Sequence, residues 1–378
     1  TVQRLRSVMG RVLACSSAKS SGAWGVKVGR RSGQGGGGLI ITAMFRAPLS
    51  RRRCIQALAL GGLARRAGAQ GRITIRLSHV VARQTPKGLA LERFGELVRA
   101  RSQGRIDVVV YPNSLLFGDA DEMQALQLGA VDMLAPSLSK FGRLGFPEFE
   151  LFDLPFLFET RTQVYRAMQG RLGQALLAGL ARQRMVGLGY LDNGFKHMSA
   201  NRPLAVPHDF AGLHMRVQGS RVIAHQMRAL GARPVVLDFG ETRRALAMGV
   251  VDGTENPISN FWTQRMHEVQ THLSLTHHGY LGYAVVVHQR FWAHLAGPDR
   301  QLVAAALEEA LAWGNAIARS ENEQALATLR ESGGIHIHDP SAAQRQQLRA
   351  ATAEVYQGLE RRIGRQWLEQ VQQEWITG

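Results

Sequence analysis

The fold is decided by residues 72–114, RITIRLSHVVARQTPKGLALERFGELVRARSQGRIDVVVYPNS. Alternating residues at 73–77 predict a strand. After Pro86 the apolar residues recur at helical spacing, and Gly104 is the residue type that commonly follows the end of a helix. The β-branched run 106–111 predicts a second, buried strand. This alternation of strand, helix and strand favours an α/β fold with largely parallel strands and short loops.

The same alternation continues through the rest of the chain. The C-terminal part predicts helices, because Leu348, Val355, Leu359, Ile363, Leu368, Val371 and Trp375 form an apolar stripe. Two α/β lobes joined by crossing strands, with a cleft between them, are the simplest arrangement of these elements. A further helix is expected at 122–128, and further strands at 131–135, 185–190, 212–217, 234–237 and 283–288.

The positive charge is concentrated at the start of the chain. The formal charge of the 378 residues is +17, but residues 1–70 hold 13 Lys and Arg and no acidic residue, which leaves +4 for residues 71–378. A nearly balanced body argues against nucleic acid as a partner. Cys15 and Cys54 both lie in the basic stretch, so residues 71–378 cannot form a disulfide framework.

We expect residues 1–70 to be a leader that is removed on export. From about residue 50 the chain has three arginines, an apolar stretch and the triplet Ala67-Gly68-Ala69, which resembles a twin-arginine-like signal and its cleavage site. The mature protein is then expected to start near Gly71 as a soluble periplasmic body. We expect the residues before Met44 to come from an over-extended reading frame. A disordered basic arm is the alternative interpretation.

Few features of the sequence indicate catalysis. Ser137 and Lys140 match the S-x-x-K pattern of serine acylases, but such a short pattern is common by chance and its companion motifs do not follow. A serine hydrolase using these two residues is kept as the alternative from a different class. Residues 71–378 contain no nucleotide-binding glycine loop and no zinc motif, so we expect neither cofactor nor metal.

Three polar residues stand where an α/β protein usually binds its ligand, outside the carboxyl ends of strands. Arg216 ends a predicted strand, Lys196 stands in a predicted loop after the strand that ends near Tyr190, and Asn256 lies in VVDGTENP. An arginine can hold a carboxylate with two parallel hydrogen bonds, and an asparagine offers both donor and acceptor. A surface pair between Arg216 and an acidic residue is the alternative. Composition and spacing alone therefore indicate an α/β protein with an anion site.

Several segments in order along the body resemble the solute-binding subunits of tripartite (TRAP-type) transporters, and most closely the C4-dicarboxylate-binding branch. The segments are SHVV at 78–81, TPKG at 85–88, YPNS at 111–114, LQLGAVDMLAPSLSKF at 126–141, DLPF at 153–156, DNGFKHMSANRP at 192–203, GVVDGTENP at 249–257 and HGYLGY at 278–283.

The resemblance implies two lobes that close on a ligand, with a long helix across both. We expect residues 71–193 plus 282–321 to form the first lobe and residues 194–281 plus 322–378 the second. Six ligand-binding residues follow from matching positions: Arg216 and Asn256 on one carboxylate, Lys196 as the cation of the second lobe, Ser137 and Lys87 on the first lobe, and Phe239 as an apolar wall.

The function implied is that of a receptor, not an enzyme. It would capture malate, succinate or fumarate and deliver it to a sodium-driven permease with a small and a large membrane subunit. Another organic acid, such as a 2-oxo acid or an aromatic carboxylate, is the alternative ligand, and a receptor that signals to a membrane kinase is a further alternative. Arg243 and Arg244 depart from the family pattern; we expect them to be solvated helix residues, with a wider ligand range as the alternative.

Overall fold

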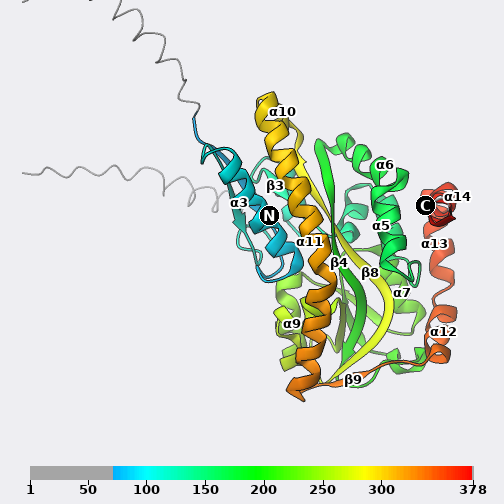
Figure 1. The fold of residues 1–378 in the computed structure, drawn as a ribbon. Helices are drawn as coiled ribbons and strands as arrows, with labels where there is room; N and C mark the ends of the chain where they lie inside the picture. Colours follow the sequence, from blue (N-terminus) through cyan, green and yellow to red (C-terminus); the bar gives the residue numbers. More distant parts are fainter. Residues whose placement is uncertain (1–70, 377–378) are drawn as a thin grey trace, which may run out of the picture. The chain divides into compact units, whose positions relative to one another are not determined.

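The computed structural model describes residues 71–376, which form one mixed sheet with helices on both of its sides (Figure 1). The predicted leader, its export signal and its cleavage site lie outside the described residues. The α/β fold class expected from the sequence is confirmed.

Two long antiparallel strands, β4 and β8, form the centre of the sheet. Strands β3, β1 and β2 continue the sheet from β8, and we call them its first half. Strands β7, β5 and β6 continue it from β4 as the second half, and β9 pairs with one end of β8. The strands are β1 Ile73–Ser78, β2 Ile106–Tyr111, β3 Met133–Leu134, β4 Met185–Ala200, β5 His214–Val217, β6 Arg233–Val236, β7 Gly253–Asn256, β8 His272–His288 and β9 His336–His338.

The expected strands exist, but the two central ones are much longer than predicted. The strand expected at 185–190 is only the beginning of β4, and the strand expected at 283–288 is only the end of β8. Pairing is parallel within each half, between β1 and β2 and between β5 and β6. It is antiparallel along β4 and β8, so the prediction of largely parallel strands was wrong at the centre of the sheet.

The helices expected in the body are present. The helix predicted after Pro86 is α3, and the helix predicted at 122–128 is α4. The helices are α3 Pro86–Arg101, α4 Glu122–Gln127, α5 Arg161–Gln169, α6 Arg171–Gly179, α7 Arg221–Ala229, α8 Thr242–Ala247, α9 Ile258–Thr263, α10 Gln289–His294, α11 Gly297–Ser332, α12 Ala342–Ala351, α13 Glu354–Ile363 and α14 Arg365–Ile376.

The long helix α11 runs along the sheet from α10 to the strand β9, with α3 beside it (Figure 1). Its 36 residues correspond to about 54 Å at 1.5 Å per residue. The buried residues Val303, Leu307 and Ala310 recur at helical spacing and face the sheet. Gly314 allows a close approach to α3, since a Cβ atom at this position would lie 2.5 Å from the Cβ of Ala90.

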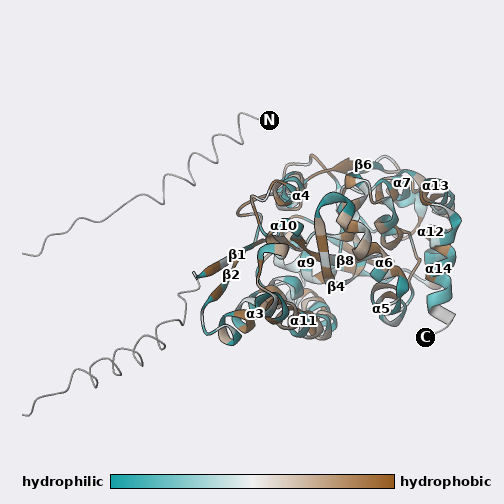
Figure 2. Ribbon diagram, turned by 90° about the horizontal axis from the view of Figure 1, so that it is seen from above, coloured by the Kyte–Doolittle hydropathy of each residue, from teal (hydrophilic) through white to brown (hydrophobic). Residues whose placement is uncertain are grey.

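The last three helices pack on the other side of the sheet. Val355, Leu359, Ile363 and Val371 are buried in the same apolar cluster as α5 and α6, which confirms this part of the predicted apolar stripe, whereas Leu348 is buried in a different cluster. Hydrophilic colour prevails on α14 in Figure 2, whereas hydrophobic colour is found along the strands β1 and β2. None of the helices described in residues 71–376 has the length and apolar character needed to cross a bilayer.

The sheet brings polar segments from its two halves together. The turn after β3 leads into the 3₁₀ helix η1 Leu138–Leu144, and the first turn of α3 lies close by, since Lys87 donates to the carbonyl of Ala135. The ends of β5, β6 and β7 arrive from the second half. These segments line the site described next.

Candidate functional site

Two adjoining cavities lie between the halves of the sheet. The larger has a volume of about 100 Å³ and the smaller about 20 Å³. Both are lined by Asp119, Lys140 and Gln218, so they form one continuous site. The large cavity also contains Arg143, Arg216 and Asp238, and the small one Lys87, Ser137, Phe239, Asn256, Asn260 and Tyr283.

Arg216 is the buried cation of the large cavity, with 1% of its surface exposed. It lies on β5 between β6 and β7, and its Nε and Nη2 donate to the carbonyl of Leu237 at 3.0 and 2.9 Å. Nη1 has no hydrogen-bond partner, and no carboxylate of residues 71–376 forms an ion pair with this guanidinium. Burial lowers the pKa of Arg216, yet an arginine stays protonated in proteins. The site therefore holds a buried positive charge with a free donor.

Three further predicted residues surround the small cavity. The ring of Phe239 lies 5.6 Å from the guanidinium of Arg216. Asn256, at the end of β7, is buried and directs Nδ2 to the hydroxyl of Thr254 at 3.3 Å. The hydroxyl of Ser137 donates to Oε1 of Gln218 at 2.6 Å, which joins the two halves. The structure thus brings Arg216, Phe239, Asn256 and Ser137 together, as expected.

Lys87 is a second buried cation without a carboxylate partner. Its Nζ donates to the carbonyl of Ala135 at 2.9 Å and lies 3.7 Å from the centroid of the Tyr283 ring. Among the described residues no ion pair to Lys87 is formed. Burial, opposed by the more distant carboxylate of Glu122, lowers the pKa of Lys87 to about 7.

Lys196 does not line either of these two cavities. The expected loop is instead part of β4, so the side chain points into the protein, where Nζ lies 2.8 Å from Glu255 and 3.8 Å from Asp153. Neighbouring residues of a strand point to opposite faces, so a lysine that meets Glu255 lies on the opposite side from Asn256. Burial alone would raise the pKa of Glu255, but Lys196 and His278 lower it to about 2. Lys196 is therefore already neutralised.

Lys140 is also neutralised, which bears on the hydrolase alternative. Its Nζ contacts the carboxylates of Asp119 and Glu122. Burial opposes the charge, but these two carboxylates together raise the pKa of Lys140. A lysine held in its protonated form cannot take a proton from Ser137, whose hydroxyl is bonded to Gln218 instead. The geometry does not support an acylating serine.

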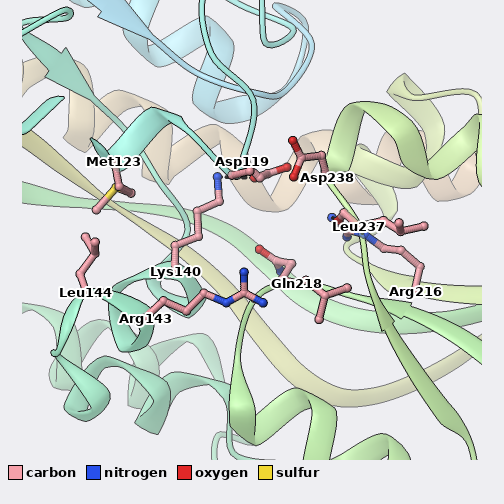
Figure 3. A pocket seen from close by; sticks show the side chains of 12 residues that line it. Asp119, Met123, Lys140, Arg143, Leu144, Arg216, Gln218, Leu237 and Asp238 are labelled. Carbon is pink, nitrogen blue, oxygen red and sulfur yellow. Dashed lines mark hydrogen bonds and ion pairs between the residues drawn. The ribbon is translucent and has the colours of Figure 1, made fainter. Parts of the chain in front are cut away.

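Two aspartates join the halves reciprocally. The carboxylate of Asp119 accepts the backbone N–H of Phe239, and the carboxylate of Asp238 accepts the backbone N–H of Ala120. Figure 3 shows both aspartates at the same side of the large cavity. We call these two hydrogen bonds the aspartate clasp.

Sequence reasoning missed several residues of the site, among them Gln218, Asp119, Arg143 and Tyr283. A signal existed for Gln218, because it stands two residues after Arg216, the spacing that brings side chains to the same side of an extended chain. Asp119 lies in an irregular segment before α4, where no sequence pattern indicates a role in the site.

The two arginines that depart from the family pattern are placed outside the site. Arg243 pairs with Glu268 at 2.6 Å, and the exposed Arg244 lies 3.9 Å from Glu241. Neither lines either cavity, which favours the interpretation as solvated residues.

Comparisons with known proteins agree with this arrangement. Residues 77–362 match the family described as bacterial extracellular solute-binding protein, family 7. A relative from Rhodobacter capsulatus, the C4-dicarboxylate-binding periplasmic protein DctP, is 48% identical over 292 residues, which cover 77% of this chain and 88% of the relative.

Solved structures show the same fold. A TRAP periplasmic solute-binding protein from Shewanella oneidensis with bound succinate is 41% identical, with a TM-score of 0.79 over 80% of this chain and 99% of that one. One from Pseudomonas aeruginosa with bound L-malate is 36% identical, with a TM-score of 0.73 over 76% and 99%.

Removing the charge of Lys196 should destabilise the folded protein. We expect Lys196→Met to lower the free energy of unfolding by about 3–5 kcal/mol, because Glu255 is left buried without its main counter-charge. The double variant Lys196→Met, Glu255→Gln should recover part of this loss. Urea unfolding of the three proteins provides the measurement, and a loss below about 1 kcal/mol would contradict the assignment.

Lys87 should impose a pH dependence on stability. Its pKa is about 7 in the folded protein and the ordinary value when unfolded, so the unfolded chain binds more protons above pH 7. Stability of the wild type should therefore rise with pH above about 7, relative to Lys87→Met, by up to about 1.4 kcal/mol per pH unit. Below pH 7 the difference between the two proteins should be constant. Thermal melts of both proteins without ligand from pH 6 to 9 measure this difference. If the two plots of stability against pH stay parallel over the whole range, Lys87 is not desolvated.

Proposed function

The chain belongs to family 7 of the bacterial extracellular solute-binding proteins, and we propose that it is the receptor of a TRAP-type transporter that binds a C4-dicarboxylate such as succinate, malate or fumarate. The observation that carries this proposal is Arg216, a buried guanidinium with an unpartnered Nη1 and no ion pair to any carboxylate of the described residues; Asp119, Glu255 and Asp238 act on it only electrostatically. A ligand carboxylate supplies both the missing acceptor and the missing charge.

A buried cation without a counter-charge destabilises the protein, whereas a well-placed carboxylate turns it into a charge-assisted pair. The ring of Phe239 lies 5.6 Å from Arg216, and Asn256 lines the adjoining small cavity, so these two residues offer an apolar and a polar wall near such a carboxylate site. Lys87, whose pKa burial lowers to about 7, adds a second amine without an ion-pair partner at the small cavity, and a nearby ligand carboxylate would favour its protonated form. Two cations without partners favour a dianion over a monocarboxylate.

Ligand binding is coupled to closure in this proposal. We assign residues 71–193 plus 282–321 to the first lobe and residues 194–281 plus 322–378 to the second, which places Lys87 and Ser137 opposite Arg216 and Asn256. The Ser137–Gln218 hydrogen bond and the aspartate clasp then join the lobes. The closed receptor would present its ligand to the small and large membrane subunits of the permease from the periplasm.

A thermal-shift comparison tests the function. Succinate and malate should raise the melting temperature, because a ligand that binds only the folded state adds RT ln(1 + [L]/Kd), about 2.7 kcal/mol at a hundredfold excess over Kd. Butyrate matches succinate in length but leaves one cation unpaired, so its shift should be much smaller. Equal shifts would contradict a dicarboxylate site, and a larger shift with a 2-oxo acid or an aromatic carboxylate would reassign the ligand.

The role of Arg216 has its own test. Arg216→Lys keeps the charge but loses the planar pair of donors. We expect the Kd for succinate to rise about ten- to hundredfold, the effect of losing one charge-assisted hydrogen bond. Calorimetry gives the affinity, and Arg243→Lys is the matched control outside the site. An unchanged Kd would remove Arg216 from the carboxylate site.

A further inference from the structure

Arg143 is an arginine of the large cavity without a partner. It lies near the end of η1, on the half of the site opposite Arg216, and it is an exposed residue whose side chain nevertheless lines the cavity. Within residues 71–376 no hydrogen bond or ion pair engages its guanidinium. Figure 3 shows the guanidinium extended towards Gln218, in the middle of the cavity.

The backbone on the opposite side leaves room for this guanidinium. A Cβ atom on Gly219 would lie 2.7 Å from Nε and 2.9 Å from Cζ of Arg143, so any other residue at 219 would displace the arginine. Gly219 directly follows Gln218, and both line the large cavity. Arg143 thus spans from one half of the site to the backbone of the other.

The two cavities differ in the room that they offer a ligand. The small cavity, at about 20 Å³, has room for about one water molecule. The large cavity, at about 100 Å³, is the one that can hold the body of a small acid. Lys87 at the small cavity therefore acts on such a ligand through its field or through a water, and the groups that touch the ligand belong mainly to the large cavity.

The cations of the large cavity differ in what they can still bind. Lys140 is occupied by Asp119 and Glu122. Arg216 has the donor for one carboxylate, as proposed above. Arg143 is the remaining cation, and it has all its donors free.

We propose that Arg143, together with Gln218, binds the second carboxylate of the ligand and so selects dicarboxylates over monocarboxylates. This inference rests on the proposed function. A planar guanidinium can hold a carboxylate through two parallel hydrogen bonds, and the amide of Gln218 can turn its NH₂ group to the same ligand. Since Arg143 is exposed, its charge is available to an incoming anion before the site closes.

The test is a set of affinities for succinate and butyrate. Arg143→Gln should weaken the binding of succinate about tenfold and leave the binding of butyrate unchanged, because only the second carboxylate of succinate loses a charged partner. Arg244→Gln is the matched control, an exposed arginine outside the cavities, and should change neither affinity. Gly219→Ala should weaken succinate selectively without removing any charge, since the new methyl group displaces the Arg143 side chain.

The outcomes separate this inference from the function. If wild type binds succinate and Arg143→Gln binds it equally well, the role of Arg143 is overturned while the receptor function stands. If Lys87→Met loses affinity for succinate and Arg143→Gln does not, the second carboxylate lies at the small cavity, and the inference is overturned as well. If wild type binds no dicarboxylate, the proposed function fails, and this inference with it.

Discussion

The antiparallel pair of β4 and β8 is the constraint on which the rest of the structure depends. The first half of the sheet is attached to β8 through β3, and the second half is attached to β4 through β7. The position of Lys87 and Arg143 relative to Arg216 is therefore set by the register of these two strands. Their ladder bends at three irregularities, between Gly187 and Gly189, Asp192 and Gly194, and Lys196 and Met198. Gly194 has φ +140°, which other residues rarely adopt, so the bend needs a glycine there.

Two buried cations, Lys196 on β4 and Arg216 on β5, differ in how the protein compensates their charge. Lys196 and Arg216 are each 1% exposed. Lys196 is compensated by Glu255, and the cluster that includes His278 fixes β4, β7 and β8 against one another. Arg216 donates its hydrogen bonds to the carbonyl of Leu237 and forms no ion pair with a carboxylate of residues 71–376, although Asp119, Glu255 and Asp238 stabilise its charge from a distance. Because an unpaired buried charge costs several kcal/mol, its persistence is best explained by a partner that arrives from outside.

The sequence alone predicted the main helices and strands and part of the site. Local periodicity predicted β1, α3 and β2, and family resemblance placed Arg216, Asn256, Phe239, Ser137 and Lys87, which the structure brings to adjoining cavities. The length of β4 could not be predicted, because Asp192, Asn193 and Gly194 are residue types of loops, and only pairing with β8 keeps them in a strand. Lys196 was expected in a loop for the same reason, whereas it lies in β4. Its partner Glu255 is 59 residues away, and no local pattern connects them.

Closure of the site is held by few interactions that do not involve a ligand. The Ser137–Gln218 hydrogen bond and the two bonds of the aspartate clasp are each worth about 0.5–1.5 kcal/mol, or somewhat more where a carboxylate accepts. In the closure proposed above, Arg216 is buried and the unpaired Arg143 comes towards it, which opposes closing. A dianion reverses only the unfavourable contribution, because it compensates the cations while the hydrogen bonds stay as they are. The ligand therefore shifts the population towards the closed form by the difference in its affinity for the two arrangements. The unpaired arginines, which weaken the closed form by themselves, are what makes that difference large.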